Sequence, residues 1–141
     1  MKKLVVLVTA LALGSFGCSD DSGDSGSQEV TLTFQAVVGT ETFVCGDTYD
    51  NLGADDSTLT ISDFRFFVQS VELKNDAGDY VPVTLTENDW QAEGAALLDF
   101  EDGCNDLGTE PTNATVIGTI PAGTYDGIRF EMGVPFEANH D

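Results

Sequence analysis

The chain has 141 residues, 25 of them acidic and 5 basic, which gives a formal net charge of −20 at pH 7. A chain of this length forms one domain at most. A surface so negative repels nucleic acid and anionic lipid and favours cations, so nucleic-acid binding is excluded. We expect most of the carboxylates to keep an exported protein soluble. A metal is considered only where acidic residues cluster with other ligands.

Residues 1–17 have the layout of a bacterial export signal. Two lysines precede an apolar run from Leu4 to Leu13, which is too short to span a bilayer permanently. Gly17 before Cys18 is typical of lipoprotein processing, in which Cys18 becomes the lipidated first residue of the mature chain. The alternative is ordinary cleavage after Gly14. We expect an exported protein whose lipid holds it to the outer membrane, on the periplasmic side or at the cell surface.

The number of cysteines agrees with lipidation. Three cysteines leave one unpaired thiol in an exported chain, unless lipid takes Cys18 and leaves Cys45 and Cys104 to join. An oxidising compartment favours that disulfide. It would close a loop of about sixty residues, for which the chain-entropy model gives about 4 kcal/mol of stabilisation. A metal site made by the same two thiolates is the alternative.

The stretch after Cys18 reads "SDDSGDSGSQ" and contains no apolar residue to bury. We therefore interpret residues 18–28 as a lipidated cysteine followed by a flexible tether, and residues 29–141 as the folded domain. Loss of the two lysines with the signal would take the formal charge from −20 to −22.

The first predicted strand covers residues 29–38, where apolar residues recur at every second position, so that one face is buried. A second strand, or a bent pair of strands, is predicted over residues 57–74. Its apolar side chains fall on two opposite faces, which predicts burial on both sides of the strand. One face carries Phe64, Phe66 and Val68, and the other carries Phe67, Val71 and Leu73.

Further strands follow at intervals of about ten to fifteen residues. The sequence "NDAGD" at 75–79 predicts a turn into a hairpin arm at 80–85, and Pro82 places that arm at a sheet edge. Short apolar runs cover residues 95–100 and 114–120, and a last strand follows a turn in the segment 120–136. No stretch of twelve residues has helical periodicity.

These patterns predict an all-β chain folded as an antiparallel β-sandwich. The sequence halts just after Pro135 and Phe136, where a turn would lead into a strand that closes the second sheet. Because a long unpaired edge is a liability, we expect the chain to be the N-terminal part of a larger domain, with the sandwich incomplete at the C-terminus.

No constellation of catalytic residues is visible. The chain has one histidine, His140, and no G-x-S-x-G motif, so a nucleophile with its base and orienting group is hard to assemble. A phosphate-binding loop and a dinucleotide fingerprint are also missing. We therefore predict that the protein is not an enzyme.

The densest acidic patch is "LDFEDGCND" at 98–106. Calcium binds several oxygens from flexible loops, and Asp99, Glu101, Asp102 and Asp106 could supply them. The spacing matches no known calcium loop, so a solvated loop pinned by Cys104 is the competing interpretation. Paired carboxylates are expected by chance in so acidic a chain.

Trp90 is the only tryptophan, and it sits among polar residues just before a predicted strand. The ordinary interpretation is a tryptophan in the core or at its rim, which contributes buried apolar surface.

Several motifs, taken together and in order, resemble one family. They are "FVCG" at 43–46, "SDFRFFV" with "VEL" within 62–73, a Trp followed by "ALLDFEDG" and a Cys within 90–104, "TN" with "TVIGTIPAGTYDGIRF" within 112–130, and "GVPFEANHD" at 133–141. In this combination the chain resembles the MbnP-type family of methanobactin-associated copper-binding proteins, which are exported and often lipid-anchored. The resemblance covers nearly all of the chain from Glu29 onward.

The resemblance implies a partner and a site. In that family a di-haem enzyme of the MauG type oxidises a tryptophan to kynurenine, and related copper-repressible surface proteins bind copper through histidines and a kynurenine nitrogen. Carried over to this chain, Trp90 is the candidate for oxidation and His140 the candidate copper ligand. Those copper-repressible relatives have a histidine two residues after the tryptophan, where this chain has Ala92.

The alternative function belongs to a different class of protein. It is a non-catalytic β-sandwich at the cell surface, for adhesion or structure, stabilised by calcium instead of binding copper.

Overall fold

The computed structural model describes residues 7–10, 26–104 and 110–140. Most of the predicted export signal and tether, Cys18 and Asp106 lie outside the described residues. In chain order the strands are β1 (Leu7–Ala10), β2 (Ser27–Gln35), β3 (Val37–Val38), β4 (Glu41–Thr42), β5 (Thr48–Leu52), β6 (Ser57–Thr60), β7 (Arg65–Asn75), β8 (Tyr80–Pro82), β9 (Thr84–Leu85), β10 (Gln91–Ala92), β11 (Ala95–Asp99), β12 (Thr115–Pro121) and β13 (Tyr125–Met132). A short 3-10 helix, η2 (Glu137–Asn139), follows them.

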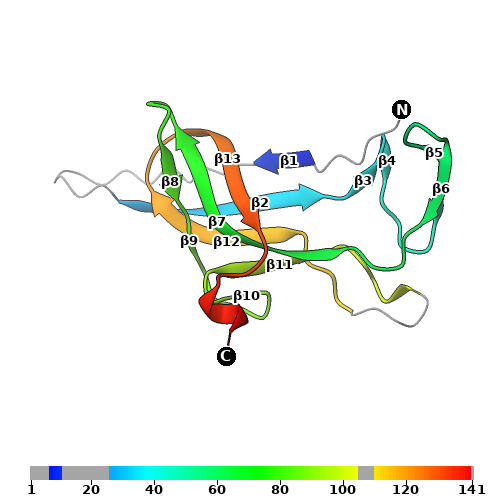
Figure 1. Ribbon diagram of the computed structural model, residues 1–141. Coiled ribbons are helices and arrows are strands. Elements are labelled where there is room, and N and C mark those ends of the chain that lie inside the picture. Colours follow the sequence, from blue (N-terminus) through cyan, green and yellow to red (C-terminus); the bar gives the residue numbers. More distant parts are fainter. Residues whose placement is uncertain (1–6, 11–25, 105–109, 141) are drawn as a thin grey trace.

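The described strands form two main antiparallel sheets (Figure 1). One sheet has the order β1-β2-β12-β9, and the other has the order β10-β11-β7-β13, with β8 paired to β7. Two small ribbons, β3–β4 and β5–β6, extend one end of the molecule. Side chains from both main sheets meet in one core, which confirms the predicted antiparallel β-sandwich. Among the described residues, no helix has the length and apolar character needed to cross a membrane.

Strand β2 with β3 confirms the predicted strand over residues 29–38. Leu32 and Phe34 are buried while Thr31 and Thr33 are exposed, as the period of two requires. β2 pairs with β12 along its length and with β1 on its other edge. Since β1 lies within the predicted export signal, cleavage of that signal would leave this edge of β2 open.

The segment 57–74 forms a bent pair of strands, β6 and β7. The predicted burial of both faces of β7 is wrong. Val68, Val71 and Leu73 all belong to the same core cluster, because β7 bulges at Ser70, which has a φ of 49°. The register with β13 shifts at this point. The extra residue returns Val71 to the inner face. Phe67, which precedes the bulge and alternates with Val68, points away from the core and is 43% exposed.

The predicted hairpin is present, and its second arm passes between the sheets. β8 pairs with β7 after the turn at residues 75–79. Pro82, which has no N–H to donate, ends β8 at an edge. The next residues enter the other sheet, where β9 pairs with β12. Val83 is buried at this crossing.

The core contains two clusters joined by Phe100. The larger lies between the main sheets, where the ring of Phe34 meets that of Phe130 edge to face with centroids 5.7 Å apart. Burying a side chain such as Phe34 stabilises the fold by about 1.5–3 kcal/mol. The smaller cluster fills the end that carries β3 to β6, where Phe64 contacts the rings of Phe43, Phe66 and Phe100. Cys45 packs against this second cluster.

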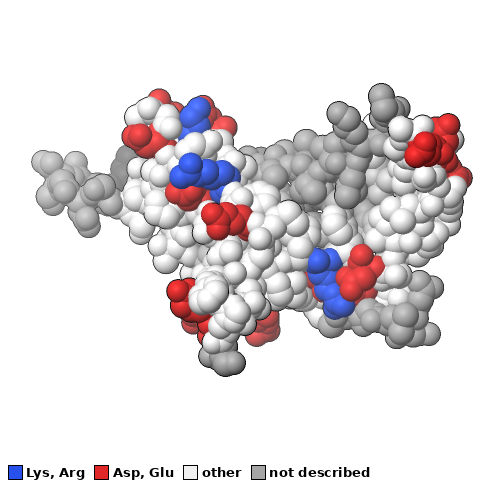
Figure 2. Space-filling model, viewed as in Figure 1, with Lys and Arg blue, Asp and Glu red and all other residues white. Residues whose placement is uncertain are grey.

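Basic side chains on the face shown in Figure 2 lie beside acidic ones. Arg129 on β13 forms an ion pair with Glu72 on β7 and stacks over the Tyr80 ring, with its guanidinium carbon 4.0 Å from the ring centroid. Hydrogen bonding to Arg129 lowers the pKa of the Glu72 carboxyl. This pair ties the two strands together on the outer surface.

Replacing Arg129 by methionine is expected to raise the pKa of Glu72 back toward the ordinary glutamate range. The depressed pKa means that Glu72 adds to stability above the ordinary glutamate pKa, and that this contribution is lost as the pH falls through the lower folded-state pKa. Carboxyl carbon NMR of Glu72 during an acid titration measures the change. Lys74→Met is the matched control and should leave the titration of Glu72 unchanged. Equal pKa values in the wild type and in Arg129→Met would refute the assignment.

Candidate functional site

The position of Trp90 follows from its neighbour Gln91. Gln91 is 2% exposed, and its Nε2 donates to the carbonyl oxygens of Thr86 and Ile117, at 2.7 Å each. Its Oε1 accepts a hydrogen bond from the backbone N–H of Ile117 at 2.7 Å. Gln91 thus reaches across to the other sheet. Trp90 lies in the turn just before β10 and is half-buried, and we expect its side chain on the face opposite to that of Gln91.

Trp90 belongs to a row of apolar side chains on this outer face. The backbone N–H of Leu97 donates to the carbonyl of Trp90 at 2.8 Å, which continues the register that pairs Gln91 with Ala96. Leu97 in turn lies opposite Phe67. Residues that face each other across adjacent strands have side chains on the same side. We call Trp90, Leu97 and Phe67 the outer row.

The C-terminal segment lies along the same face. The backbone N–H of Gly133 donates to the carbonyl of Phe67 at 2.8 Å, and Gln69 Nε2 donates to the carbonyl of Val134 at 3.1 Å. Further on, Pro135 lies against Gly94, since a Cβ built on that glycine would be 3.9 Å from the proline Cγ. The outer row and the segment leading to His140 therefore share one side of the sheet.

Helix η2 brings His140 to the end of this segment, beside β10 (Figure 1). The His140 imidazole is exposed and packs against the Phe136 ring with centroids 4.2 Å apart. A hollow of about 290 Å³ separates η2 from the β10–β11 turn, and Glu93 and Glu137 contribute carboxylates to its lining. The hollow thus lies between the turn that follows β10 and the short helix that leads to His140.

A larger cleft of about 670 Å³ opens on the other side of β10. Gln91 and Ala92 form one wall, and Glu72, Glu87 and Glu131 lie along it. Glu72 is already paired with Arg129. β10 therefore stands between two hollows, with acidic side chains in both.

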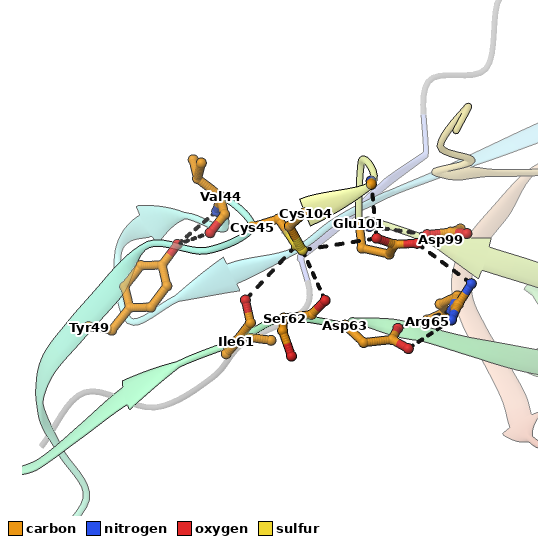
Figure 3. The surroundings of a disulfide bond; sticks show 11 residues. Val44, Cys45, Tyr49, Ile61, Ser62, Asp63, Arg65, Asp99, Glu101 and Cys104 are labelled. Atoms are coloured by element: carbon orange, nitrogen blue, oxygen red, sulfur yellow. Dashed lines mark hydrogen bonds and ion pairs between the residues drawn. A yellow bond between two sulfur atoms is a disulfide. The ribbon is translucent and has the colours of Figure 1, made fainter. Parts of the chain in front are cut away.

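A second group of ligand-type residues surrounds the disulfide (Figure 3), near the end of the sandwich that carries β3 to β6. The predicted bond between Cys45 and Cys104 is confirmed, with the two Cα atoms 5.5 Å apart. Glu101 is fully buried beside it, with Oε2 4.0 Å from Cys104 Sγ. Among the described residues, Cys45, Glu101 and Cys104 are the group of cysteine, histidine and acidic side chains close enough together to hold a metal ion.

Buried charge around Glu101 is partly compensated by one arginine. Arg65 Nη1 lies 3.6 Å from Glu101 Oε1, and the same guanidinium holds the exposed carboxylate of Asp63 at 2.8 Å. Asp99, 1% exposed, accepts a hydrogen bond from the backbone N–H of Glu101 at 3.1 Å. Desolvation of Asp99 raises the pKa of its carboxyl, and the hydrogen bond from Glu101 opposes that shift.

The residues of the predicted calcium loop have different surroundings. Asp99 and Glu101 are buried and accept hydrogen bonds from backbone N–H groups nearby, whereas Asp102 is exposed. Asp106 lies outside the described residues. The prediction of a cation at this loop stays a prediction.

Sequence reasoning missed two features of these sites. The first is the outer row, because the bulge at Ser70 moves Val71 and Leu73 to the inner face and leaves Phe67 on the outer face without them. The second is the approach of Arg65 to Glu101, which are far apart in the chain. A signal for the second was present, since Arg65 interrupts the run of phenylalanines that ends in the buried region of β7.

A family model described as MbnP matches residues 27–141. Among solved structures, MbnP from Methylosinus trichosporium is similar to the chain, with 36% sequence identity and a TM-score of 0.66. The match covers 78% of this chain and 40% of that chain, so the chain spans about two fifths of the length of the structure that it matches. No curated protein matches it.

Proposed function

We propose, since the chain belongs to the MbnP family, that it is an exported, membrane-anchored copper-binding protein associated with methanobactin. In this proposal Trp90 is oxidised to kynurenine by a MauG-like di-haem partner, and His140 is a copper ligand. The protein is a substrate and carrier here, not an enzyme. Lipid on Cys18 would hold it to the outer membrane.

One observation carries the proposal: the outer face that bears Trp90 also bears the segment leading to His140. The sequence separates the two residues by fifty positions. The hydrogen bonds of Gln69 and Gly133 fix the C-terminal segment to this face. Gln91 fixes the start of β10, directly after Trp90.

The proposed ligands on this face are nitrogen donors, which copper binds well. Imidazole is a good copper ligand, and His140 supplies one. An indole N–H can only donate a hydrogen bond, whereas the aromatic amine of kynurenine has a lone pair for a metal. Oxidation of Trp90 would therefore add a second nitrogen donor. Copper is the cargo in this scheme, and the carboxylates of Glu93 and Glu137 at the nearby hollow favour the approach of a cation.

Oxidation of Trp90 requires removal of four electrons to reach N-formylkynurenine. Two water molecules supply the added oxygen atoms and four protons are released, while the di-haem partner passes the four electrons to two molecules of hydrogen peroxide, which are reduced to water. Hydrolysis then releases formate and leaves kynurenine. Trp90 is half-buried, so part of the residue is at the surface, within reach of a docked protein for electron transfer.

Co-expression with a MauG-like di-haem protein is expected to convert Trp90 to kynurenine, because the indole lies on an open face of the sheet. Peptide mass spectrometry of residues 75–129 detects the change. Trp90→Phe is the negative control, and Tyr80, an exposed aromatic residue outside the row, should stay unmodified. Recovery of unmodified Trp90 alongside a haem-loaded, peroxide-reactive partner would count against the proposal.

A further inference from the structure

The cluster of Cys45, Cys104 and Glu101 has the chemistry of a metal site that the disulfide keeps closed. The two sulfur atoms and a Glu101 carboxylate oxygen all lie within 4.8 Å of one another. Cys104 is 9% exposed and Glu101 is 0% exposed, while Cys45 is partly exposed. The sulfur of Cys45 is thus the one that an external thiol would reach first.

The residues around the disulfide can also accept hydrogen bonds from the two thiols that reduction produces. Cys104 Sγ lies 2.9 Å from the carbonyl oxygen of Ser62, and Cys45 Sγ lies 3.9 Å from that of Ile61. Both oxygens can accept a hydrogen bond from a thiol. The loop that carries Cys45 is held independently by Tyr49, whose hydroxyl accepts from Val44 N–H at 2.7 Å and donates to its carbonyl at 3.2 Å.

We infer that reduction of the Cys45–Cys104 disulfide creates a site for a divalent thiophilic cation of the zinc class, with both thiolates and Glu101 as ligands. A dithiol reductant supplies two electrons and two protons to break the S–S bond and is itself oxidised to a disulfide. Binding of the cation then releases the two thiol protons. The inference goes beyond the proposed function and does not depend on it, because neither Trp90 nor His140 takes part.

Charge and coordination both favour a divalent ion. Two thiolates and one carboxylate carry three negative charges, of which a divalent cation offsets two, and the guanidinium of Arg65, shared with Asp63, lies 3.6 Å from Glu101. Zinc takes cysteine and carboxylate ligands at about 2.3 Å and 2.0–2.2 Å in a tetrahedral set of four. Three protein ligands leave the fourth position for water. The bound ion would also restore a link between the two loops that the disulfide joins.

The test uses the full chain with Cys18→Ser, so that Cys45 and Cys104 are the only thiols. Protein reduced by a dithiol and desalted without oxygen is titrated with Zn²⁺ alone, and bound metal is measured by competition with a chromogenic chelator. We expect one Zn²⁺ per reduced chain and none at this site in the oxidised chain. Bound zinc should slow alkylation of both thiols at least tenfold and raise the melting temperature of the reduced protein.

Glu101→Gln in the same background should weaken zinc affinity at least tenfold, whereas Asp102→Asn, the exposed neighbouring acid, should not change it. His140→Ala should also leave zinc binding intact, which separates this site from the proposed copper site. Equal alkylation rates with and without zinc, or a reduced chain that zinc does not stabilise, would overturn the inference. The alkylation rate and the melting temperature of the reduced chain test the inference even if Glu101→Gln is too unstable to assay.

Discussion

Replacing Gln91 by leucine is expected to lower the free energy of unfolding by about 3 kcal/mol. Leucine has a similar volume and no polar atoms, so the substitution keeps the packing and removes three hydrogen bonds to Thr86 and Ile117. A buried donor or acceptor left without a partner costs about 1–3 kcal/mol. In this variant the N–H of Ile117 loses the amide oxygen of Gln91 as its partner, whereas the C=O of Ile117 keeps a hydrogen bond from the Thr86 N–H at 3.0 Å.

The matched control is Gln28→Leu. Gln28 makes similar amide contacts, donating to the carbonyl of Gly123 at 3.1 Å and accepting from its N–H at 3.4 Å, but these bonds are exposed to water. Its loss should cost about 0.5 kcal/mol. Urea unfolding gives both values. The emission of Trp90 should shift to longer wavelength in the native state of Gln91→Leu and stay unchanged in Gln28→Leu. Equal costs for the two variants would show that Gln91 is not the link between the sheets.

Replacing Gly118 by alanine is expected to destabilise the protein by about 3 kcal/mol, at the upper end of the usual range for overpacking. A Cβ at this position would lie 2.5 Å from the carbonyl oxygen of Thr84 and 2.5 Å from Val83 Cγ1. The first of these atoms is backbone and cannot rotate away. β9 would have to move from β12, where Gly118 pairs with Leu85.

Gly127→Ala is the control for the loss of a glycine in a strand. A Cβ there would meet the side chain of Lys74, at 3.1 Å from its Cβ and 3.4 Å from its Cδ. The contact with the Lys74 Cβ requires a shift of only a few tenths of an ångström, and no backbone atom is among the contacts, so the cost should be about 1 kcal/mol. Thermal unfolding of the two variants compares them directly. A cost at Gly118 no larger than at Gly127 would mean that β9 yields easily, and that the crossing between the sheets is not tightly packed.

Much of the fold could be predicted from periodicity because each strand has one buried face. The alternation in β2 and the glycine- and proline-rich turns gave the strands of the sandwich, and the number of cysteines gave the disulfide. The bulge at Ser70 could not be predicted in this way. Serine seldom adopts a positive φ, and the bulge shifts the period by one residue, which moves Val71 and Leu73 to the inner face and leaves Phe67 on the outer face.

The candidate sites depend on contacts between distant residues, and these leave little local signal. Gln91 belongs to a run of polar residues around Trp90, and nothing near it in the sequence shows that its amide reaches Ile117 in another sheet. Glu101 lies in an acidic loop that looks solvated, yet it is fully buried beside the disulfide. Only the folded arrangement distinguishes it from Asp102, its exposed neighbour.

The most direct test of the proposed site is a copper titration followed by tryptophan fluorescence. Trp90 is the only tryptophan, so its emission reports on the outer row alone, in protein made without the oxidising partner. Cu²⁺ bound at His140 should quench this emission to saturation at one equivalent, and His140→Ala should weaken the apparent affinity at least tenfold. Quenching that is the same in the wild type and in His140→Ala would contradict a copper site shared by Trp90 and His140.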